Sequence, residues 1–139
     1  MKTNFLFDFE KEEKIKVSFT LDSDIKKTLK DFSKKTKYSI SKIIEAILEK
    51  PINDNVFEDV ETVNKYLKSY EVKLNSLINK EVKEQMSITM KKSIKEVLND
   101  FSKQNKKPLS MLLNAFLKKA IEDNVLESAE SLKAFVVKG

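Results

Sequence analysis

The sequence predicts a mainly helical protein with one short two-stranded antiparallel β-ribbon. One Gly and two Pro among 139 residues argue against a turn-rich all-β fold or a disordered linker protein. Hydrophobic residues make up 40% and charged residues 35%, which suits a core divided among short amphipathic elements. The chain also contains one segment twice, and each copy opens with the alternating pattern of a strand.

The repeat aligns Lys16 with Gln85, 69 positions later, and continues without a gap. About 40% of the positions between Lys16 and Val56 are identical to their counterparts. The clearest matches are DFSKKTK (Asp31–Lys37) with DFSKQNK (Asp100–Lys106), and INDNV (Ile52–Val56) with IEDNV (Ile121–Val125). A weaker match reaches the pair Tyr66 and Phe135, which indicates a third helix after each copy.

Each copy begins with alternating apolar and polar residues, IKVSFTLD (Ile15–Asp22) and EQMSITMK (Glu84–Lys91). This period is typical of a half-buried strand. The polar positions are Lys16, Ser18 and Thr20 in the first copy and Gln85, Ser87 and Thr89 in the second. A single strand cannot pair its own backbone, so we expect the two strands to pair with each other and to leave this polar face open.

Two apolar stripes at helical spacing follow each strand and predict four helices that cover the apolar face of the ribbon. The first stripe is Ile25, Leu29 and Phe32, repeated as Ile94, Leu98 and Phe101; the second runs from Ile40 to Leu48 and from Leu109 to Leu117. Asp22 is the expected N-cap of the first helix, and its replacement by Lys91 predicts a weaker start in the second copy. Ser39 or Ser41 can cap the second helix of the first copy, whereas Pro108 starts its counterpart.

The predicted organisation is an N-terminal arm (1–14), a first repeat (15–56), a linker helix (57–83), a second repeat (84–125) and a short C-terminal helix (126–139). In the linker, Val60, Val63, Leu67, Tyr70, Leu74 and Leu77 follow heptad spacing. This helix either docks on its own repeat or pairs with another chain. The apolar arm segment, with Phe5, Leu6, Phe7 and Phe9, is expected to pack onto that surface or to cover a ribbon end.

Composition excludes several kinds of chemistry. The sequence has no Cys and no His, which removes thiol nucleophiles, histidine acid–base catalysis and the usual zinc sites, so we expect no enzyme, no metal and no cofactor. No small-molecule ligand is indicated. Asp8 and Glu10 interrupt any signal-peptide core, and the longest apolar runs are far below the ~18 residues of a membrane span, so a cytoplasmic protein without membrane contact is expected.

The charge pattern favours a polyanionic partner. All 27 basic residues are Lys, set against 22 acidic residues, for a net charge of +5. Residues 11–50 hold 11 Lys against 7 acidic residues, and residues 85–121 hold 8 against 2, whereas residues 51–84 and 122–139 are net acidic. The repeats are therefore basic and the third helices acidic.

A strand of this pattern followed by two helices resembles the ribbon-helix-helix DNA-binding family, the fold of the Arc, MetJ and CopG repressors. The resemblance covers Lys16–Lys50 and Gln85–Lys119, in the tandem single-chain form of TraY-type proteins. It implies a tandem pseudo-dimer, to which the repeat match adds an extra helix after each repeat. It also implies that the ribbon enters the major groove and that the second helix of each repeat binds a phosphate at its N-terminus.

Carried onto this chain, the resemblance implies base contacts from Lys16, Ser18, Thr20, Gln85, Ser87 and Thr89. The implied phosphate contacts are Ser39, Ile40, Ser41, Pro108, Leu109 and Ser110, through their amides, together with the loop residues Lys37, Lys106 and Lys107. Two departures stand out. The turn between the helices has Lys where the family often has Gly, which could shift the turn onto Thr36 or Asn105, and no Arg is present for the commonest guanine contact.

The expected function is a sequence-specific double-stranded DNA-binding transcriptional regulator, acting as a repressor, with self-association of pseudo-dimers on DNA. Alternatives are a plasmid or relaxosome accessory protein, an antitoxin, and a helical protein-interaction adaptor with an incidental basic face. The strands could also be ordinary sheet with a solvated face, the loop lysines simply solvated, and the serines ordinary helix caps.

Overall fold

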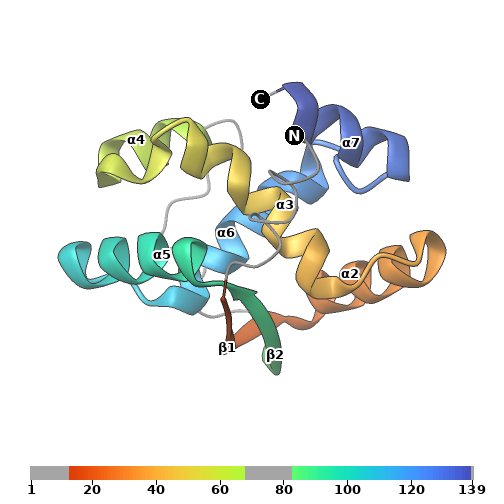
Figure 1. Cartoon of the computed structure of the whole chain (residues 1–139), viewed down its shortest axis with the longest axis horizontal. Coiled ribbons are helices and arrows are strands. Elements are labelled where there is room, and N and C mark those ends of the chain that lie inside the picture. The colour runs from red at the N-terminus through yellow and green to blue at the C-terminus, as the bar shows by residue number, and fades with distance from the viewer. Residues whose placement is uncertain (1–12, 68–82, 139) are drawn as a thin grey trace.

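The computed structural model describes residues 13–67 and 83–138. It confirms a mainly helical protein with a single two-stranded antiparallel sheet in the described part (Figure 1). The apolar arm segment and the linker positions Tyr70, Leu74 and Leu77 lie outside the described residues. No helix among the described residues has the length and apolar character needed to cross a membrane.

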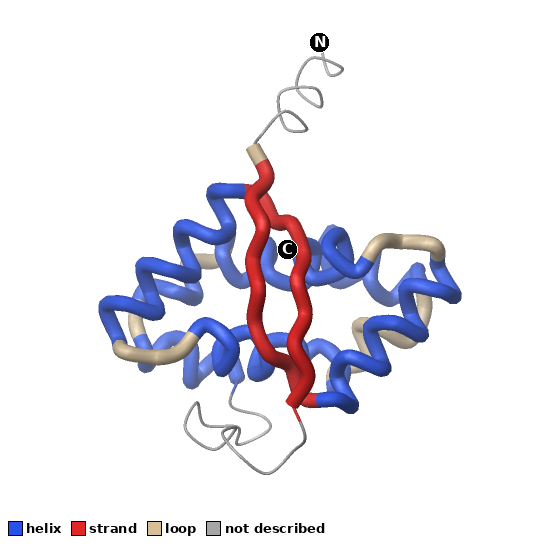
Figure 2. Tube along the Cα trace, turned by 90° about the horizontal axis from the view of Figure 1, so that it is seen from below, coloured by secondary structure: helices blue, strands red, loops and turns tan. Residues whose placement is uncertain are grey.

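The sheet pairs β1 (Lys14–Asp22) with β2 (Lys83–Lys91), so both strands come from one chain. Ser18 lies opposite Ser87, its own counterpart in the repeat. Exchanging every residue for its counterpart reproduces the same pairing, and the two copies therefore occupy equivalent places in the ribbon. Figure 2 shows the ribbon running across one face of the molecule, with helices on both sides of it.

Two helices follow each strand: α2 (Ser23–Thr36) and α3 (Ile40–Asn53) after β1, and α5 (Lys92–Asn105) and α6 (Leu109–Glu122) after β2. In Figure 1, α3 and α6 cross in the middle, and α2 and α5 lie to either side. The core joins the inner ribbon residues to the predicted helical stripes. Its members from the ribbon are Val17, Phe19, Leu21, Met86, Ile88 and Met90.

The third helices cross over between the copies. A short 3-10 turn, η1 (Val56–Glu58), leads into α4 (Val60–Leu67), which packs against α6; α7 (Ala129–Lys138) packs against α3. Phe57 and Tyr66 both stack on Phe116 of α6, with ring centroids 4.8 and 5.3 Å apart. Burial in this contact, with a smaller effect of nearby Asp123, raises the pKa of Tyr66 to about 12. The described part of the linker helix, α4, thus packs on α6 of the other repeat of the same chain, whereas docking on its own repeat was one of the two expected arrangements. Pairing of the linker with another chain stays a prediction.

The turn between the helices keeps its lysines. Lys37 and Lys106 adopt the left-handed conformation, with φ of 70° and 54°, so the expected shift to Thr36 or Asn105 was wrong. The reason is local: the side chains of Thr36 and Asn105 each donate to the carbonyl four residues earlier, in the last turn of the helix. Each of these two residues stays in its helix, and the following lysine makes the turn.

The helix starts match the expected positions but not every expected bond. Asp22 and Lys91 hold the N-cap positions of α2 and α5, and neither side chain makes a capping hydrogen bond. At α3 the choice between two serines is settled in favour of Ser39, whose hydroxyl accepts from the Lys42 amide at 3.1 Å. The Ser41 hydroxyl instead accepts from a strand amide, that of Thr89.

Candidate nucleic-acid interface

The candidate interface is the outer ribbon face, defined as Lys16, Ser18, Thr20, Gln85, Ser87 and Thr89. All six side chains are exposed, while the alternate residues of both strands from Val17 to Leu21 and from Met86 to Met90 are buried. The register sets Lys16 opposite Thr89 and Thr20 opposite Gln85. The structure thus brings together on one face all six residues chosen from the sequence.

The centre of this face is a pair of serines. The Ser18 and Ser87 hydroxyl oxygens lie 2.8 Å apart and share a hydrogen bond. One hydroxyl must donate to the other, so the pair retains one donor and several acceptor lone pairs for a ligand. The ends of the face differ, since one has the Lys16 ammonium and the other has the Gln85 amide.

The ribbon is held at its edges by the first turns of α3 and α6. The Thr20 amide donates to the Ser110 hydroxyl at 3.0 Å, and the Thr89 amide donates to the Ser41 hydroxyl at 3.2 Å. These bonds satisfy strand-edge amides that would otherwise face solvent. They also fix the N-terminus of each second helix beside the strand of the other repeat.

Two buried polar side chains continue the same edge contacts. Asn114 accepts from the Asp22 amide at 2.8 Å and donates to the Thr20 carbonyl at 3.0 Å. Glu45, its counterpart in the repeat, accepts from the Lys91 amide at 2.7 Å. Neither residue was singled out from the sequence, although each is the polar residue that interrupts a contiguous apolar run at the same place in both copies.

The predicted phosphate contacts at the helix starts are backbone amides, and one of the six positions has no N–H to offer. The hydroxyls of Ser39, Ser41 and Ser110 are occupied by protein amides. Pro108 is the N-cap of α6 and has no N–H to donate. The predicted amides that remain are those of Ser39, Ile40 and Ser41 at α3 and of Leu109 and Ser110 at α6, and none of them has an earlier partner within its helix.

The predicted loop lysines lie in the turns that precede these helix starts. Lys37 and Lys106 are exposed, and Lys107 is half-buried. The turns are built alike, because Ser33 donates its hydroxyl to the Tyr38 carbonyl and Ser102 donates to the Lys107 carbonyl, each at 2.5 Å. Both repeats thus present lysine side chains in the same turn geometry.

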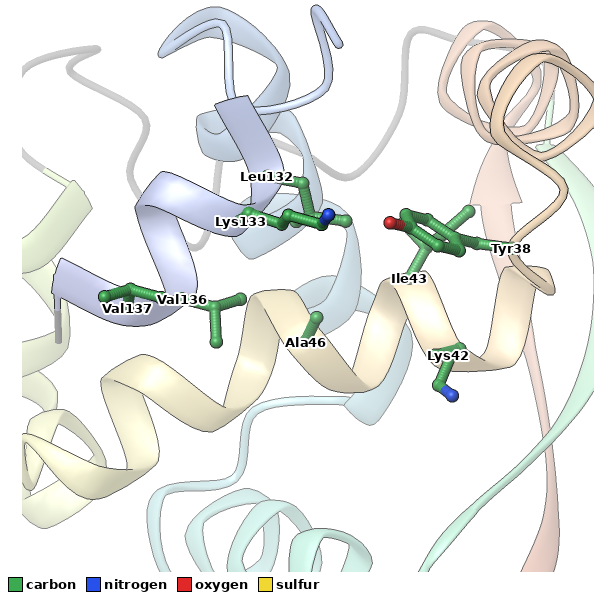
Figure 3. A pocket seen from close by; sticks show the side chains of 8 residues that line it. All are labelled: Tyr38, Lys42, Ile43, Ala46, Leu132, Lys133, Val136 and Val137. Atoms are coloured by element: carbon green, nitrogen blue, oxygen red, sulfur yellow. The ribbon is translucent and has the colours of Figure 1, made fainter. Parts of the chain in front are cut away.

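A separate apolar pocket of about 340 Å³ lies between α3 and α7 (Figure 3). Its walls include Ile43, Ala46, Leu132 and Val136, with Tyr38 near one end. The pocket therefore offers apolar surface and little polar chemistry.

Among the described residues, no group of three or more Asp or Glu side chains is placed to hold a metal ion.

Comparison of the chain with protein-family models, with curated proteins and with solved structures finds no significant match in any of the three. The function has to be inferred from the geometry of the chain itself.

Proposed function

We propose that this chain is a sequence-specific double-stranded DNA-binding regulator, built as a tandem ribbon-helix-helix pseudo-dimer with an extra helix after each repeat. The observation that carries the proposal is the outer ribbon face: six polar side chains from two paired strands are exposed together over a buried apolar face. A two-stranded ribbon fits a major groove about 12 Å wide. Occupation of a promoter would make the protein a repressor.

The side chains of the face suit base edges. Gln85 can bind adenine through two hydrogen bonds, and the Lys16 ammonium can donate to guanine O6 or N7. Ser and Thr hydroxyls can donate or accept. Because the Ser18–Ser87 pair uses one of its own donors internally, the central contact is weaker than the two ends, and base preference should come mainly from Lys16 and Gln85.

The same geometry supports phosphate contacts beside the groove. Ser41 and Ser110 tie the N-termini of α3 and α6 to the strand edges. A helix N-terminus presents free N–H groups and a partial positive charge, which favour a phosphate oxygen. Lys37, Lys106 and Lys107 add positive charge in the preceding turns, and phosphate contacts of this kind set affinity without selecting sequence.

The two ends of the face are chemically different, so each chain should bind an asymmetric site. Lys16 with Thr89 faces one half of the site and Gln85 with Thr20 the other. A homodimer of a single repeat would instead present two identical ends. Selection from randomised duplexes should return sites without internal two-fold symmetry.

The test compares two variants on the selected duplex and on random duplexes. Gln85→Ala should cost about 1–3 kcal/mol on the selected site and relax preference at one base pair. Lys107→Ala should weaken all duplexes nearly equally and lower the salt slope of binding by about 0.9. Lys65→Ala, an exposed lysine on α4, serves as the control and should change neither quantity.

Equal effects of Gln85→Ala and Lys107→Ala on specificity and on salt slope would reject the ribbon as the base-contacting element. Binding with no sequence-dependent component at any salt concentration would favour the adaptor alternative. A footprint upstream of the protein's own gene would support the repressor role, whereas a footprint at a plasmid transfer origin would support the accessory role.

A further inference from the structure

Two equivalent cavities lie where the halves of the chain meet, and their charges are reversed. We call them the Asp22 cavity and the Lys91 cavity. The Asp22 cavity is lined by Asp22, Asp24, Ile25, Thr28, Lys118, Ile121 and Glu122, and the Lys91 cavity by Lys91, Ser93, Ile94, Val97, Glu49, Ile52 and Asn53. Every residue of one is the repeat counterpart of a residue of the other. Each cavity is therefore formed by the strand–helix junction of one repeat and the second helix of the other.

Two charged positions have exchanged sign between the two cavities, Asp22 for Lys91 and Lys118 for Glu49, whereas Asp24 and Glu122 have the neutral counterparts Ser93 and Asn53. In the Lys91 cavity the ammonium lies 2.7 Å from the Glu49 carboxylate, and Lys91 is only 9% exposed at its side chain. In the Asp22 cavity the junction residue is the acid and the helix residue is Lys118. Asp22 is 4% exposed, so its charge is as deeply buried as that of Lys91, at 7%.

Pairing of identical halves would bring like charges together in these cavities. Two first repeats would set Asp22 and Asp24 against Glu49, with no lysine among the lining positions. Two second repeats would set Lys91 against Lys118, with Glu122 as the single acid. A buried charge without an opposite partner is costly, whereas the pairing of unlike halves gives each cavity one acid–lysine pair at the exchanged positions.

We propose that these reversed charges make the first and second repeats selective for each other and reject pairing between identical halves of two chains. A dimer of two chains with like halves paired always contains a pair of first repeats. The repulsion among Asp22, Asp24 and Glu49 in that pair is therefore enough to destabilise the dimer. The partner of each half is thus the unlike half, and the outer ribbon face always combines Lys16 with Thr89 and Thr20 with Gln85. This selectivity deepens the proposed function, since it preserves an asymmetric binding face.

The test exchanges residues between the cavities without changing composition or net charge. Glu49→Lys with Lys118→Glu places a second ammonium beside Lys91 and removes the lysine of the Asp22 cavity in favour of a fourth carboxylate, while pairing of like halves becomes attractive. We expect the thermal unfolding midpoint of the monomer to fall by roughly 5–10 °C. We also expect a dimer to appear in sedimentation after refolding.

A second exchange should reverse this effect. Asp22→Lys with Lys91→Asp, added together with Glu45→Asn and Asn114→Glu, returns each junction residue to an opposite charge and to its own edge contact. The full exchange should recover most of the lost midpoint and sediment as a monomer. The matched control is Lys27→Glu with Glu96→Lys, an exchange of exposed counterparts outside both cavities, which should shift the midpoint by less than about 2 °C.

Two results would overturn the proposal. One is a first exchange that stays monomeric and as stable as the control. The other is a full exchange that remains as unstable as the first, since positions 49 and 118 would then be intolerant of substitution rather than selective. No DNA enters this experiment, so its failure would leave the proposed DNA binding standing, and failure of DNA binding would leave the pairing rule standing.

Discussion

Asn114 forms hydrogen bonds with backbone groups at one edge of the ribbon, which an apolar side chain cannot do. Its amide accepts from the Asp22 N–H and donates to the Thr20 carbonyl and to the Ser110 carbonyl, and the residue is 2% exposed. An ionised carboxylate such as Glu45 can only accept, so the two counterparts hold their strands with different chemistry. The ribbon depends on these side chains because no third strand from the described residues pairs with either edge.

Asn114→Ala should lower the free energy of unfolding by about 2–3 kcal/mol, because it leaves a buried strand amide and a carbonyl without partners. Urea denaturation measures this loss. Asn64→Ala, on the exposed face of α4, is the control and should stay within about 0.5 kcal/mol of the parent. Equal stability of the two variants would mean that water replaces the Asn114 amide at no cost.

At the two lysines with left-handed backbone conformation, substitution should raise the free energy of unfolding instead of lowering it. Lys37 and Lys106 have positive φ, a conformation that costs a residue with a Cβ about 1 kcal/mol and that Gly adopts freely. Lys37→Gly and Lys106→Gly should therefore each stabilise the protein by about 0.5–1 kcal/mol in urea denaturation. Lys34→Gly, in the last turn of α2, should instead destabilise it by up to about 1 kcal/mol. Destabilisation by both turn variants would show that the lysine side chains stabilise these turns.

The residues of the outer ribbon face could be chosen from the sequence because strand alternation assigns every second side chain to one face. The roles of Ser41 and Ser110 could not. Their hydroxyls bond strand amides from the other repeat, and this depends on which helix lies beside which strand. In the sequence, a serine at a helix start gives the same pattern whether it caps the helix, binds phosphate or bonds a strand amide.

At the scale of elements, the two outer helices are equivalent in position but not in packing. Leu67 of α4 is fully buried, whereas its counterpart Val136 of α7 is 43% exposed. Lys42 lines the open pocket beside α7, whereas its counterpart Met111 on α6 is only 7% exposed. Smaller or charged side chains at these two positions leave the groove between α3 and α7 open.

Lys42→Met with Val136→Leu should close that groove, because the two new residues resemble those at the equivalent positions of the other half, Met111 on α6 and Leu67 on α4. The added buried methylene and the apolar side chain should stabilise the protein by about 1 kcal/mol, at roughly 0.8 kcal/mol for each buried methylene. The unfolding midpoint in urea measures the gain. Lys65→Met, at an exposed lysine of α4 outside the groove, should add almost nothing, and an equal gain there would show that the apolar substitution itself rather than filling is responsible.

The strands and the four helices that follow them could be predicted because each has its own period and the repeat shows each one twice. The crossing of α4 onto α6 and of α7 onto α3 could not. A heptad stripe such as Val60, Val63 and Leu67 specifies an apolar face but not its partner, and the second helices of the two repeats have nearly the same apolar stripe. The choice is made by tertiary contacts such as Phe57 and Tyr66 against Phe116.

For the whole molecule, intramolecular pairing of β1 with β2 predicts a folded monomer. One chain supplies both strands, the four helices of the repeats and both crossed outer helices. Folding is therefore a unimolecular reaction, with no association of subunits. The unfolding midpoint should then be the same from about 1 μM to 100 μM protein, whereas an obligate dimer becomes more stable as concentration rises. Circular dichroism across this range, with sedimentation at each concentration, measures both quantities. Chains that are unfolded when dilute and gain helix only as they associate would show instead that strands are exchanged between chains.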